Sequence, residues 1–534
     1  MNFVIRTEEI LQEDIMKYYV TTEGDAAILD KLKSKKPIVL VGSRGMGKSF
    51  LFRVSQMEIE KSADEKIIPV FVTFRNAAML QTANRMQFQE WMLNRISSTL
   101  LRTLRQKGYL TGNQWRFAGI VEDSFDEDSW PRKLETINKQ YEDSWKKPGE
   151  TVDTSEMPTI DDLLELIEDI CSETDIDRFI IFIDEAAHVF IPEQQMQFFS
   201  LFREMRSPYV KCNASVYPGV TYYGKTFDKT HDAEFINLTR SISSENYVKN
   251  MKEMVLRQVE DDGIRRMLEA NEGNFTVLTY AAGGNPRILL RSLDEIKNLK
   301  SDTVNKLIRE FYREEIWAEH SGLVEKYPNN AQYIDWGRDF VEEIVLPELK
   351  SKNDRLIEEK NESTVYFWVD RSAPESVNEA LRILEYTGLI KQNASGVKAT
   401  GSVIGTRYEV NLGCLLSQEQ SPTSRCEEIV NNLTVRKLNE YGANSKAFEK
   451  IKDFNLEESL KNTAEDLHRL IDNSIDILEL TNWQKDNLKK IDVNTIRDLL
   501  STEESELQKI YYVGQFKARQ MKNVALAAVF EYLY

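Results

Sequence analysis

The sequence is poor in the side chains that bind metals or form disulfides, because its 534 residues include only four cysteines and four histidines. The cysteines are scattered along the chain without the paired spacing of a zinc site, at Cys171, Cys212, Cys414 and Cys426. Cysteine usage of this kind is typical of a reducing compartment. We therefore expect a cytoplasmic protein without structural zinc.

Long apolar runs are also missing. No run reaches the length of about 20 residues that spans a membrane. The N-terminus mixes acidic and apolar residues and lacks the basic region and apolar stretch of a secretory signal. The sequence therefore predicts neither secretion nor a membrane partner.

Basic residues are outnumbered, since 87 aspartates and glutamates stand against 69 lysines and arginines, for a net charge of -18. An acidic surface repels the phosphate backbone of nucleic acids. The balance disfavours a protein that coats DNA or RNA, so any nucleic-acid contact must be local. The chain is long enough for two to four globular domains, and its 41% hydrophobic residues are ordinary for folded protein.

The first half of the chain has the pattern of a parallel sheet covered by helices. A short β-rich run enters a glycine-rich turn at residue 42 and is followed by helical apolar spacing from Phe50 to Lys61. Strands buried on both faces read as continuous apolar runs. Such runs, with the first strand included, occur at Ile38–Val41, Ile68–Phe74, Phe179–Ile183 and Phe235–Leu238. We predict an α/β fold with helices on both faces of the sheet.

The glycine-rich turn is the strongest functional motif. Its residues match the phosphate-loop pattern G-x-x-x-x-G-K-S, and they lie between a predicted strand and a predicted helix. The sequence predicts ATP bound with Mg²⁺, because glycines let backbone N–H groups surround phosphates, a lysine reaches the β and γ phosphates, and a serine hydroxyl is a ligand that Mg²⁺ prefers. The nucleotide-binding residues predicted here are Gly42, Ser43, Arg44, Gly45, Met46, Gly47, Lys48, Ser49 and Phe50.

Two carboxylates follow the strand Phe179–Ile183 directly, at Asp184 and Glu185. Ligand sites lie at the carboxyl ends of strands in parallel sheets. Asp184 is predicted to hold Mg²⁺ together with Ser49, and Glu185 to orient or deprotonate the attacking water during phosphoryl transfer. An acidic loop without function is common after a core strand, but the phosphate loop disfavours that alternative here.

Changes of pattern along the chain indicate four parts. The ATPase core covers residues 1–243, and its acidic, tryptophan-containing stretch 111–159 reads as an insertion because prolines interrupt it. Residues 244–330 read as a helical lid. Helices followed by a β-hairpin, at Val397–Thr400 and Thr406–Val410, predict a winged-helix-like domain over 331–416. After a polar stretch, residues 425–534 read as a small all-helical domain.

The phosphate loop, the Asp184-Glu185 pair and the later Gly284-Asn285-Pro286-Arg287 resemble AAA+ ATPases of the ASCE class of P-loop NTPases, most closely the clade of replication initiators and origin-recognition proteins. The resemblance covers about residues 18–299. It implies that Arg287, on the lid, contacts the γ-phosphate as a sensor. A guanidinium suits this role because it offers a rigid fork of charged donors to phosphate oxygens.

The resemblance also implies a polar sensor on the strand after Asp184 and a homo-oligomer whose neighbouring subunit supplies an arginine finger. The sensor candidates are Asn213, Ser215 and Thr221, of which we rank Asn213 first. The finger has no obvious counterpart, because the stretch before Phe235 offers Lys225, Lys229 and His231, with Arg203 and Arg206 as alternatives.

The winged-helix-like domain resembles the domain that follows the lid in replication initiators. Its candidate recognition helix is Ser376–Leu389. Glu375, Glu379 and Glu385 oppose Arg382 on this segment, so the charge does not favour a DNA major groove, and protein contact or dimerisation is an equal alternative.

The end of the chain resembles the helix-hairpin-helix module in the C-terminal domain of the RNA polymerase alpha subunit. A glycine turn there presents helix amides to phosphate. The predicted nucleic-acid contacts, for double-stranded DNA, are Lys509, Gly514, Lys517, Arg519 and Lys522. A protein-docking role is an equal alternative. Tyr511, Tyr512 and Phe516 are interpreted as core residues rather than stacking platforms.

These patterns predict an ATP-hydrolysing conformational switch that acts on DNA or on a DNA-bound partner. One alternative is a signalling or anti-phage defence ATPase of the STAND type, which holds ATP until a partner effector protein triggers it. A second is a scaffold that binds ATP without hydrolysing it, which the intact Asp184 and Glu185 disfavour.

Overall fold

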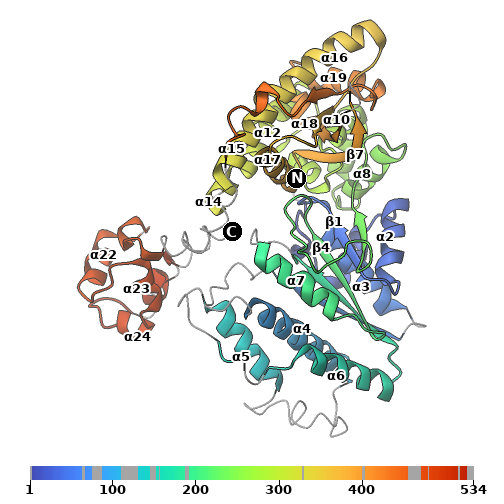
Figure 1. Ribbon diagram of the computed structural model, residues 1–534. Helices are drawn as coiled ribbons and strands as arrows, with labels where there is room; N and C mark the ends of the chain where they lie inside the picture. Colours follow the sequence, from blue (N-terminus) through green and yellow to red (C-terminus); the bar gives the residue numbers. More distant parts are fainter. Residues whose placement is uncertain are drawn as a thin grey trace.

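The computed structural model shows an N-terminal α/β domain, which the sequence predicts to be the ATPase core, an upper body of helices with a second sheet, and a small helical tail (Figure 1). Across these parts no described helix is long and apolar enough to cross a bilayer. The residues that the structure describes are 3–62, 66–74, 87–109, 130–144, 152–154, 157–186, 192–327, 330–399, 403–454, 471–478, 480–514, 517–522 and 524–525.

A five-stranded parallel sheet forms the centre of the ATPase core. Its strands are β1 Ile38–Val41, β2 Ile67–Thr73, β3 Arg178–Asp184, β4 Val210–Val216 and β5 Glu234–Asn237, in the order β2-β3-β4-β1-β5. The predicted α/β fold class is confirmed, and the predicted strands agree with β1, β2, β3 and β5 to within a residue or two at each end. Because β3, β4 and β1 are neighbours, the loops that follow them meet at one edge of the sheet.

Helices cover both faces of this sheet, which explains the continuous apolar strands. Ile180 and Phe182 of β3 pack with the face that carries α2 Glu23–Lys33 and α3 Lys48–Lys61. Phe179, Ile181 and Ile183 alternate with them and pack against the opposite layer. That layer contains α4 Gln87–Gln106, α6 Ile160–Glu173 and α7 Pro192–Glu204. At the N-terminus, short helical turns η1 Thr7–Glu9 and η2 Gln12–Asp14 precede α1 Ile15–Tyr18.

The predicted insertion 111–159 lies largely outside the described residues. Its described helix, α5 Trp130–Glu142, packs on the outside of α4 and adds no strand to the sheet. The Nδ2 of Asn94 donates to the backbone oxygen of Leu134 at 2.8 Å, and the hydroxyl of Tyr141 donates to Glu90 at 3.0 Å. The described part of the insertion is thus a helix added to the α4 side of the core.

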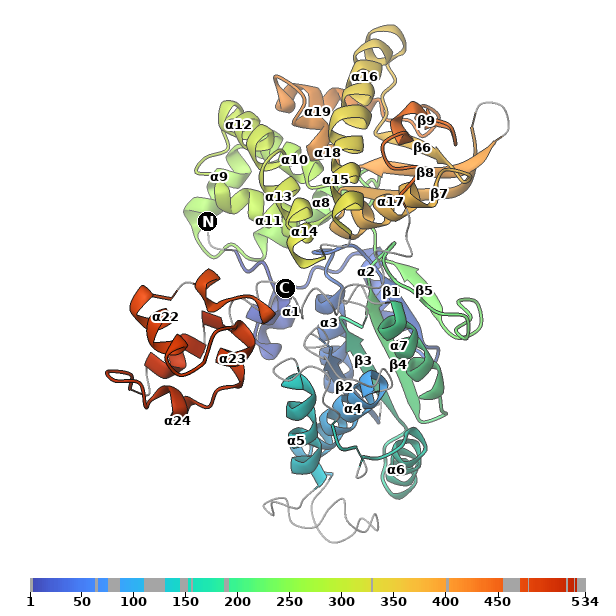
Figure 2. The same ribbon diagram turned by 60° about the vertical axis from the view of Figure 1, so that its left-hand side comes forward.

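The lid is helical, as the sequence predicts. Its helices are α8 Tyr247–Leu256, α9 Asp262–Ala270, α10 Glu272–Ala281, α11 Pro286–Glu295, α12 Ser301–Phe311, α13 Glu315–Ser321 and α14 Leu323–Lys326. The side chains of these helices share one continuous hydrophobic core with the domain that follows, so the two form a single body above the ATPase core (Figure 2).

That following domain contains a second sheet. Helix α15 Ala331–Asp339, a π-helical turn Phe340–Val345 and α16 Leu346–Lys360 lead into the strands β6 Tyr366–Asp370, β7 Ile390–Lys398, β8 Ile404–Val410 and β9 Asn439–Tyr441, in the order β7-β8-β6-β9. Strands β7 and β8 form the predicted hairpin, although β7 begins earlier than expected. Helix α17 Glu375–Thr387 lies between β6 and β7 in the chain.

The predicted boundary between this domain and the tail is wrong. Helices α18 Leu412–Leu416 and α19 Pro422–Asn431 follow the hairpin, and β9 then pairs in parallel with β6. Cys426 and Ile429 of α19 are buried in the shared core. The polar stretch around residue 420 looks like a linker, but it only leads into a further helix, so residues 425–454 belong with the second sheet.

The described part of the tail is helical and has its own hydrophobic core, formed by residues between Ile471 and Ala525. Its elements are η9 Ile475–Ile477, α22 Asn482–Lys489, α23 Ile496–Ser501 and α24 Glu504–Leu507. Thr481 and Thr495 each close a capping box at the start of a helix.

Candidate functional site: a phosphate-binding cavity between core and lid

The predicted phosphate loop connects β1 to α3, as the motif requires. Gly45 and Gly47 have φ of +85° and +94°, which L side chains rarely adopt. A Cβ at residue 45 would also lie 2.7 Å from Oδ1 of Asn285 and 2.8 Å from Cβ of Arg287. Glycine is therefore needed at position 45 both for the backbone turn and for the close approach of the lid.

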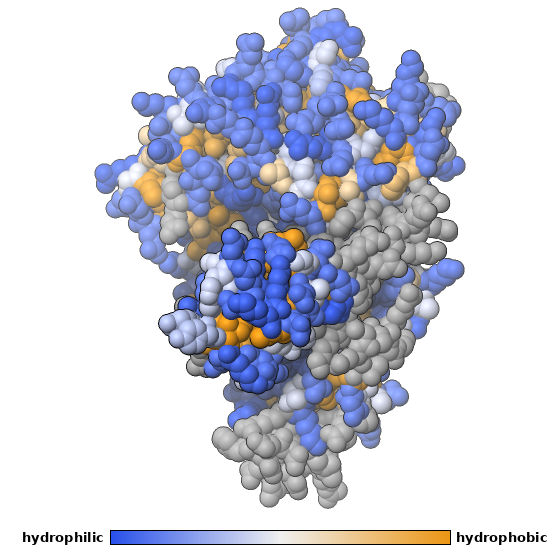
Figure 3. All heavy atoms as spheres, turned by 90° about the vertical axis from the view of Figure 1, so that its left-hand side faces the viewer, coloured by the Kyte–Doolittle hydropathy of each residue, from blue (hydrophilic) through white to orange (hydrophobic). Residues whose placement is uncertain are grey.

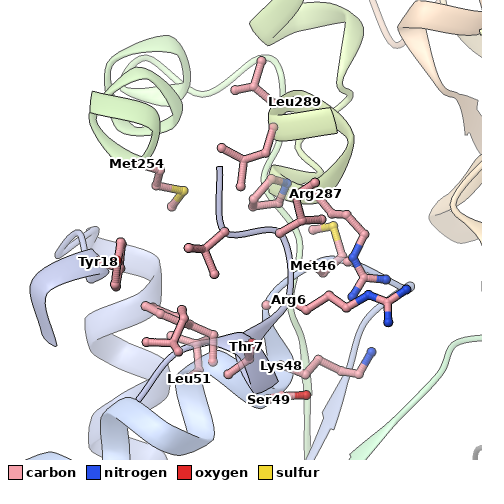
Figure 4. A pocket seen from close by; sticks show the side chains of 18 of the residues that line it. Arg6, Thr7, Tyr18, Met46, Lys48, Ser49, Leu51, Met254, Arg287 and Leu289 are labelled. Atoms are coloured by element: carbon pink, nitrogen blue, oxygen red, sulfur yellow. The ribbon is translucent and has the colours of Figure 1, made fainter. Parts of the chain in front are cut away.

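A cavity of about 420 Å³ opens beside this loop. It is lined by loop residues Arg44 to Leu51 and by both predicted carboxylates. Arg287 of the lid enters it from the other side, where Figure 4 shows it near Lys48 and Ser49 of the loop. The structure thus brings together Lys48, Ser49, Asp184, Glu185 and Arg287, although they are far apart in sequence.

Lys48 is buried and turned back onto its own loop. Its Nζ donates to the backbone oxygens of Gly42 at 2.6 Å and Ser43 at 3.3 Å, and it lies 3.9 Å from the ring centre of Tyr217. Burial lowers the pKa of Lys48 to about 7, against the attraction of Asp184 and with a further lowering by Arg287. A phosphate placed in the cavity would favour the charged form of this amine.

Asp184 and Glu185 leave the end of β3 in a geometry that one serine fixes. The hydroxyl of Ser215 donates to Oδ1 of Asp184 at 2.5 Å and accepts the N–H of Glu185 at 3.1 Å. Glu185 has φ of +56°, an unfavourable conformation for a residue with a side chain. Thr73, at the end of β2, donates to Oε2 of Glu185 at 3.5 Å. Backbone strain of this kind is concentrated at functional sites.

The ranking of Asn213 as the sensor is wrong. Its Nδ2 donates to the backbone oxygen of Leu32 at 3.0 Å, at the end of α2. Asn213 precedes Ser215 by two residues on β4, so it points to the same face but lies one step deeper in the sheet. Ser215, the second sequence candidate, is the one that reaches Asp184. The third, Thr221, donates to the backbone of Tyr217.

These oxygen groups suit a magnesium ion. Asp184 accepts Ser215 through Oδ1, so its Oδ2 could serve as a ligand, and the hydroxyl of Ser49 lines the same cavity. Carboxylate and hydroxyl oxygens, completed by water and phosphate oxygens, form the shell that Mg²⁺ prefers. The donor set therefore fits the predicted metal.

Arg287 enters the cavity from the start of α11. Asn285 caps this helix through Oδ1, which accepts the N–H of Arg287 at 3.1 Å, and its Nδ2 donates to the backbone oxygen of Arg44 at 2.8 Å. The lid motif therefore binds the phosphate loop directly. Burial, together with the nearby Arg44, lowers the pKa of Arg287 against the attraction of Glu319 and Glu8.

The other end of the cavity is apolar. It is formed by Tyr18 near the N-terminus, by Met254 and Val255 near the end of α8, and by Leu289 and Leu290 of α11. Figure 4 shows Tyr18 and Met254 on opposite sides of this end. An apolar end joined to a cationic end matches a nucleotide, whose base is flat and apolar and whose phosphates are charged. No sequence motif marks these residues.

A buried ion pair between Arg240 and Asp25 contacts the backbone of the phosphate loop. Arg240 donates to the backbone oxygen of Met46 at 2.8 Å and to Asp25 of α2 at 3.2 Å. Both residues line the cavity, and neither was found from the sequence. The pair links the phosphate loop to α2 through one guanidinium.

The predicted recognition helix is not available to a DNA groove. The corresponding helix α17 is buried on most sides, and its backbone oxygen at Tyr386 accepts the N–H of Arg44 at 3.3 Å. The rings of Tyr386 and Tyr217 are in edge contact, with centres 4.9 Å apart. A Cβ at Gly388 would lie 3.3 Å from Oγ of Ser43. The apolar face that predicted a recognition helix instead packs α17 near the phosphate loop.

The tail residues predicted to contact DNA are largely engaged within the tail. Lys509 is ion-paired with Glu506, and Arg519 with Glu504 at 3.5 Å. Lys522 donates to the backbone of Leu500 at 3.2 Å. Lys517 lies over the ring of Trp483, with its Nζ 5.5 Å from the ring centre. Gly514 follows the buried Val513. These contacts reduce the positive field that the sequence suggested.

The interpretation of Tyr511 and Tyr512 as core residues is wrong. They are 77% and 72% exposed, and their ring centres lie 4.2 Å apart. Ile510 and Val513 on either side take the core positions, which leaves the tyrosines outside. Phe516 lies outside the described residues. In Figure 3, where the tail faces the viewer, an orange hydrophobic area lies within its hydrophilic surface. The described apolar residues exposed in the tail include Ile477 and Ile491.

The candidates for an arginine finger lie away from the cavity. Arg203 donates to the backbone oxygen of Thr226 at 2.8 Å, and Arg206 pairs with Asp232 at 4.0 Å. Lys229 lies over the ring of Tyr223. None of these three described side chains lines the cavity beside the phosphate loop.

No protein-family model and no curated protein matches the chain. Among solved structures, it is similar to the ORC1 protein of Aeropyrum pernix in complex with DNA, at 13% identity and a TM-score of 0.30, covering 78% of this chain and 94% of that one. It is also similar to Cdc6p of Pyrobaculum aerophilum, at 10% identity and a TM-score of 0.31, covering 78% and 98%.

Both TM-scores are below 0.5, so the assignment depends on features of the chain itself. These features are a phosphate loop between β1 and α3, a carboxylate pair at the end of β3 and a helical lid that carries Arg287 into the same cavity. Together they give the chain the arrangement of a P-loop nucleotide-binding core with a helical lid.

Proposed function

We propose that this protein binds ATP with Mg²⁺ and hydrolyses it. The observation that carries the proposal is the single cavity that joins the phosphate loop, the two carboxylates, a lid arginine and an apolar end. Lys48 would bind the β and γ phosphates, Ser49 and Asp184 the metal ion, and Glu185 would orient the attacking water. Arg287 would contact the γ-phosphate.

Steady-state ATP hydrolysis by the purified protein tests this, with Glu185→Gln and Lys48→Ala beside the wild type. Glu185→Gln should bind ATP and lose most turnover, because the side chain keeps its size but no longer takes a proton. Lys48→Ala should lose affinity for ATP. A wild-type protein that binds no ATP would contradict the proposal, and equal turnover in Glu185→Gln would contradict the role of Glu185.

We also propose that the nucleotide state moves the body formed by the lid and the second sheet. Arg44 of the phosphate loop contacts three elements of that body: its N–H donates to Tyr386 of α17, its backbone oxygen accepts Asn285, and its guanidinium pairs with Glu319 at 3.5 Å. A phosphate that shifts this loop would change all three contacts at once. A ligand shifts a conformational equilibrium only if it binds the two states differently, and these contacts supply such a difference.

Hydrogen exchange of α17 and α11 with and without ATP tests the switch. The Glu185→Gln variant should be used, since it would hold ATP unhydrolysed. Arg287→Ala should retain ATP binding and lose the ATP-dependent change in exchange. Identical exchange of the wild-type protein with and without ATP would refute the switch and leave the ATPase proposal intact.

A partner that triggers the switch is the second candidate function, and the position of α17 favours it. The helix that would read DNA instead packs against the phosphate loop, and the chain is acidic overall. Release of α17 by a partner protein would then free the loop. As the alternative to a partner protein, we propose that the switch acts on DNA or on a DNA-bound partner through the tail.

ATP hydrolysis with and without double-stranded DNA separates these candidates. Stimulation by DNA that is lost when Lys517 and Lys522 are changed to alanine favours the DNA-coupled switch. A low hydrolysis rate that DNA does not change, in a protein that still binds ATP, favours the partner-triggered switch. Bound ATP without turnover under any condition would favour the non-hydrolysing scaffold. Turnover per molecule that increases with protein concentration would indicate the homo-oligomer.

A further inference from the structure

The N-terminal segment forms one wall of the nucleotide cavity. Residues 4–8 and Ile10 line it together with the phosphate loop. The lid holds this segment, because Gln258 Oε1 accepts the N–H of Val4 at 2.9 Å and Asp294 accepts the N–H of Phe3 at 3.3 Å. The backbone of Arg6 is held as well, since its N–H donates to the Glu9 carboxylate at 3.4 Å and its oxygen accepts the N–H of Glu9 at 3.1 Å.

Arg6 faces the cationic end of the cavity. In Figure 4 the side chains of Arg6 and Arg287 point the same way, toward the end where Lys48 lies. These cations come from three separate segments, namely the N-terminus, the lid and the phosphate loop. Among the described residues, the ion pairs and side-chain hydrogen bonds include neither guanidinium, although Glu319 and Glu8 attract Arg287 from a longer distance.

Gathering cations is unfavourable because like charges repel. The burial of Lys48 and the partial burial of Arg287 add to this cost by removing water from their charges, whereas Arg6 is exposed. Asp184 and Glu185 line the same cavity and attract Lys48, and Glu8, which also lines it, attracts Arg287. An anion with several oxygen atoms would satisfy all three cations. The terminal phosphate of a nucleoside triphosphate has this chemistry, and arginine forks match its oxygens.

We propose that Arg6 contacts the γ-phosphate of bound ATP and stabilises its charge during hydrolysis, as an arginine finger supplied by the same chain. This inference rests on the proposed ATPase function. In the reaction, water attacks the γ-phosphorus while the bond from that phosphorus to the β,γ-bridging oxygen breaks. The electron pair stays on ADP, and the proton of the water passes to Glu185 and then to solvent. Arg6 takes no proton and only neutralises negative charge on the oxygens.

Single-turnover hydrolysis of ATP by Arg6→Ala, Arg6→Lys and the wild type tests the proposal. Arg6→Ala should lower the rate constant at least about a hundredfold, since arginine fingers contribute roughly 10³ to 10⁵ elsewhere. Arg6→Lys should recover a small part of the lost rate, because lysine keeps the positive charge but lacks the planar fork of donors. ADP affinity should not change, because ADP lacks the γ-phosphate. Folding should not suffer, since Arg6 is exposed, and an unchanged melting temperature checks this.

Arg203→Ala is the matched control, because Arg203 is also an exposed arginine of the ATPase core but lies outside the cavity. It should hydrolyse ATP at the wild-type rate, and the wild-type rate per molecule should not depend on protein concentration. A loss of rate in Arg203→Ala with full activity in Arg6→Ala would overturn the proposal and point to a finger from a neighbouring subunit.

The failure of this inference can be told from failure of the ATPase proposal. A wild-type protein that hydrolyses ATP, beside an equally active Arg6→Ala, refutes only the role of Arg6. If the wild type binds ATP without hydrolysing it, the preference for ATP over ADP becomes the measurement. Arg6→Ala should then reduce that preference, and an unchanged preference overturns the inference.

Discussion

ATP affinity should fall as pH rises above neutrality, because the lysine of the phosphate loop becomes neutral in the empty protein. Burial lowers the pKa of Lys48 from its usual 10.5 to about 7. Bound phosphate would favour the ammonium form and raise that pKa again. Above pH 7, ATP binding must therefore take up a proton, and this uptake weakens binding as the pH increases.

The size of the effect follows from the pKa. The fraction of empty protein that carries the proton falls from about one half at pH 7 to about 1% at pH 9. The Kd for MgATP should thus rise close to tenfold per pH unit above about pH 7.5, where the phosphates themselves are already ionised. His320 does not contribute, because burial lowers its pKa to about 4.

Isothermal titration calorimetry with MgATP at several pH values measures this. Buffers of different ionisation enthalpy give the number of protons taken up, which should approach one at pH 8 and above. Lys48→Arg is the control, since arginine stays charged and its Kd should not show the slope. A Kd that is constant between pH 7.5 and 9, with no proton uptake, would refute the argument and show that Lys48 is charged in the empty site.

The same shift has a consequence for the stability of the empty protein. Between pH 7 and 10.5 the unfolded chain holds a proton on Lys48 that the native chain lacks. The free energy of unfolding contributed by this group therefore increases with pH across that window and is constant below it. Urea unfolding measures this. The free energy of unfolding of the wild type should increase with pH relative to that of Lys48→Met, which has no titratable group at this position.

Three further changes test the site and its supports. Ser215→Ala removes the hydroxyl that binds Asp184, so kcat should fall on the order of tenfold to a hundredfold. Ser215→Thr retains a hydroxyl and should keep most of the wild-type kcat. Equal ATPase rates in all three proteins would argue against a positioning role for Ser215. Gly219→Ala would place a Cβ 2.6 Å from a backbone oxygen of α17, so α17 should exchange amide hydrogens faster, and unchanged exchange would contradict the predicted clash. Arg240→Ala leaves Asp25 buried and unpaired, so urea unfolding should show a loss of about 3 to 5 kcal/mol, which a second change of Asp25 to Asn should partly restore.

Features that depend on short stretches of sequence were predicted well. The phosphate loop lies between β1 and α3 because glycine turns, a strand and a helix start are all encoded within about a dozen residues. Asp184 and Glu185 follow a continuous apolar strand, and such a strand must be central in a parallel sheet. The strands β2 and β5 also follow apolar runs, although they form the two edges of the sheet.

Features that depend on strand register or on packing between distant segments were not predicted from the sequence. Asn213 and Ser215 share a face of β4, and only the register of β4 against β3 shows that Ser215 is the one level with Asp184. The exposed positions of Tyr511 and Tyr512 could not be predicted, because tyrosine is common in cores and the neighbouring Ile510 and Val513 are the residues that fill this one.

The sequence by itself determined which chemistry this chain carries: a phosphate loop, a lysine, a serine and two carboxylates, each fixed by local pattern. Only the tertiary structure decided what surrounds that chemistry. It brought Arg6, Tyr18 and Met254 to the same cavity and turned α17 onto the loop. The physical reason is that these contacts join segments hundreds of residues apart, and burial of apolar surface between bodies leaves no periodic signal by which partners could be recognised.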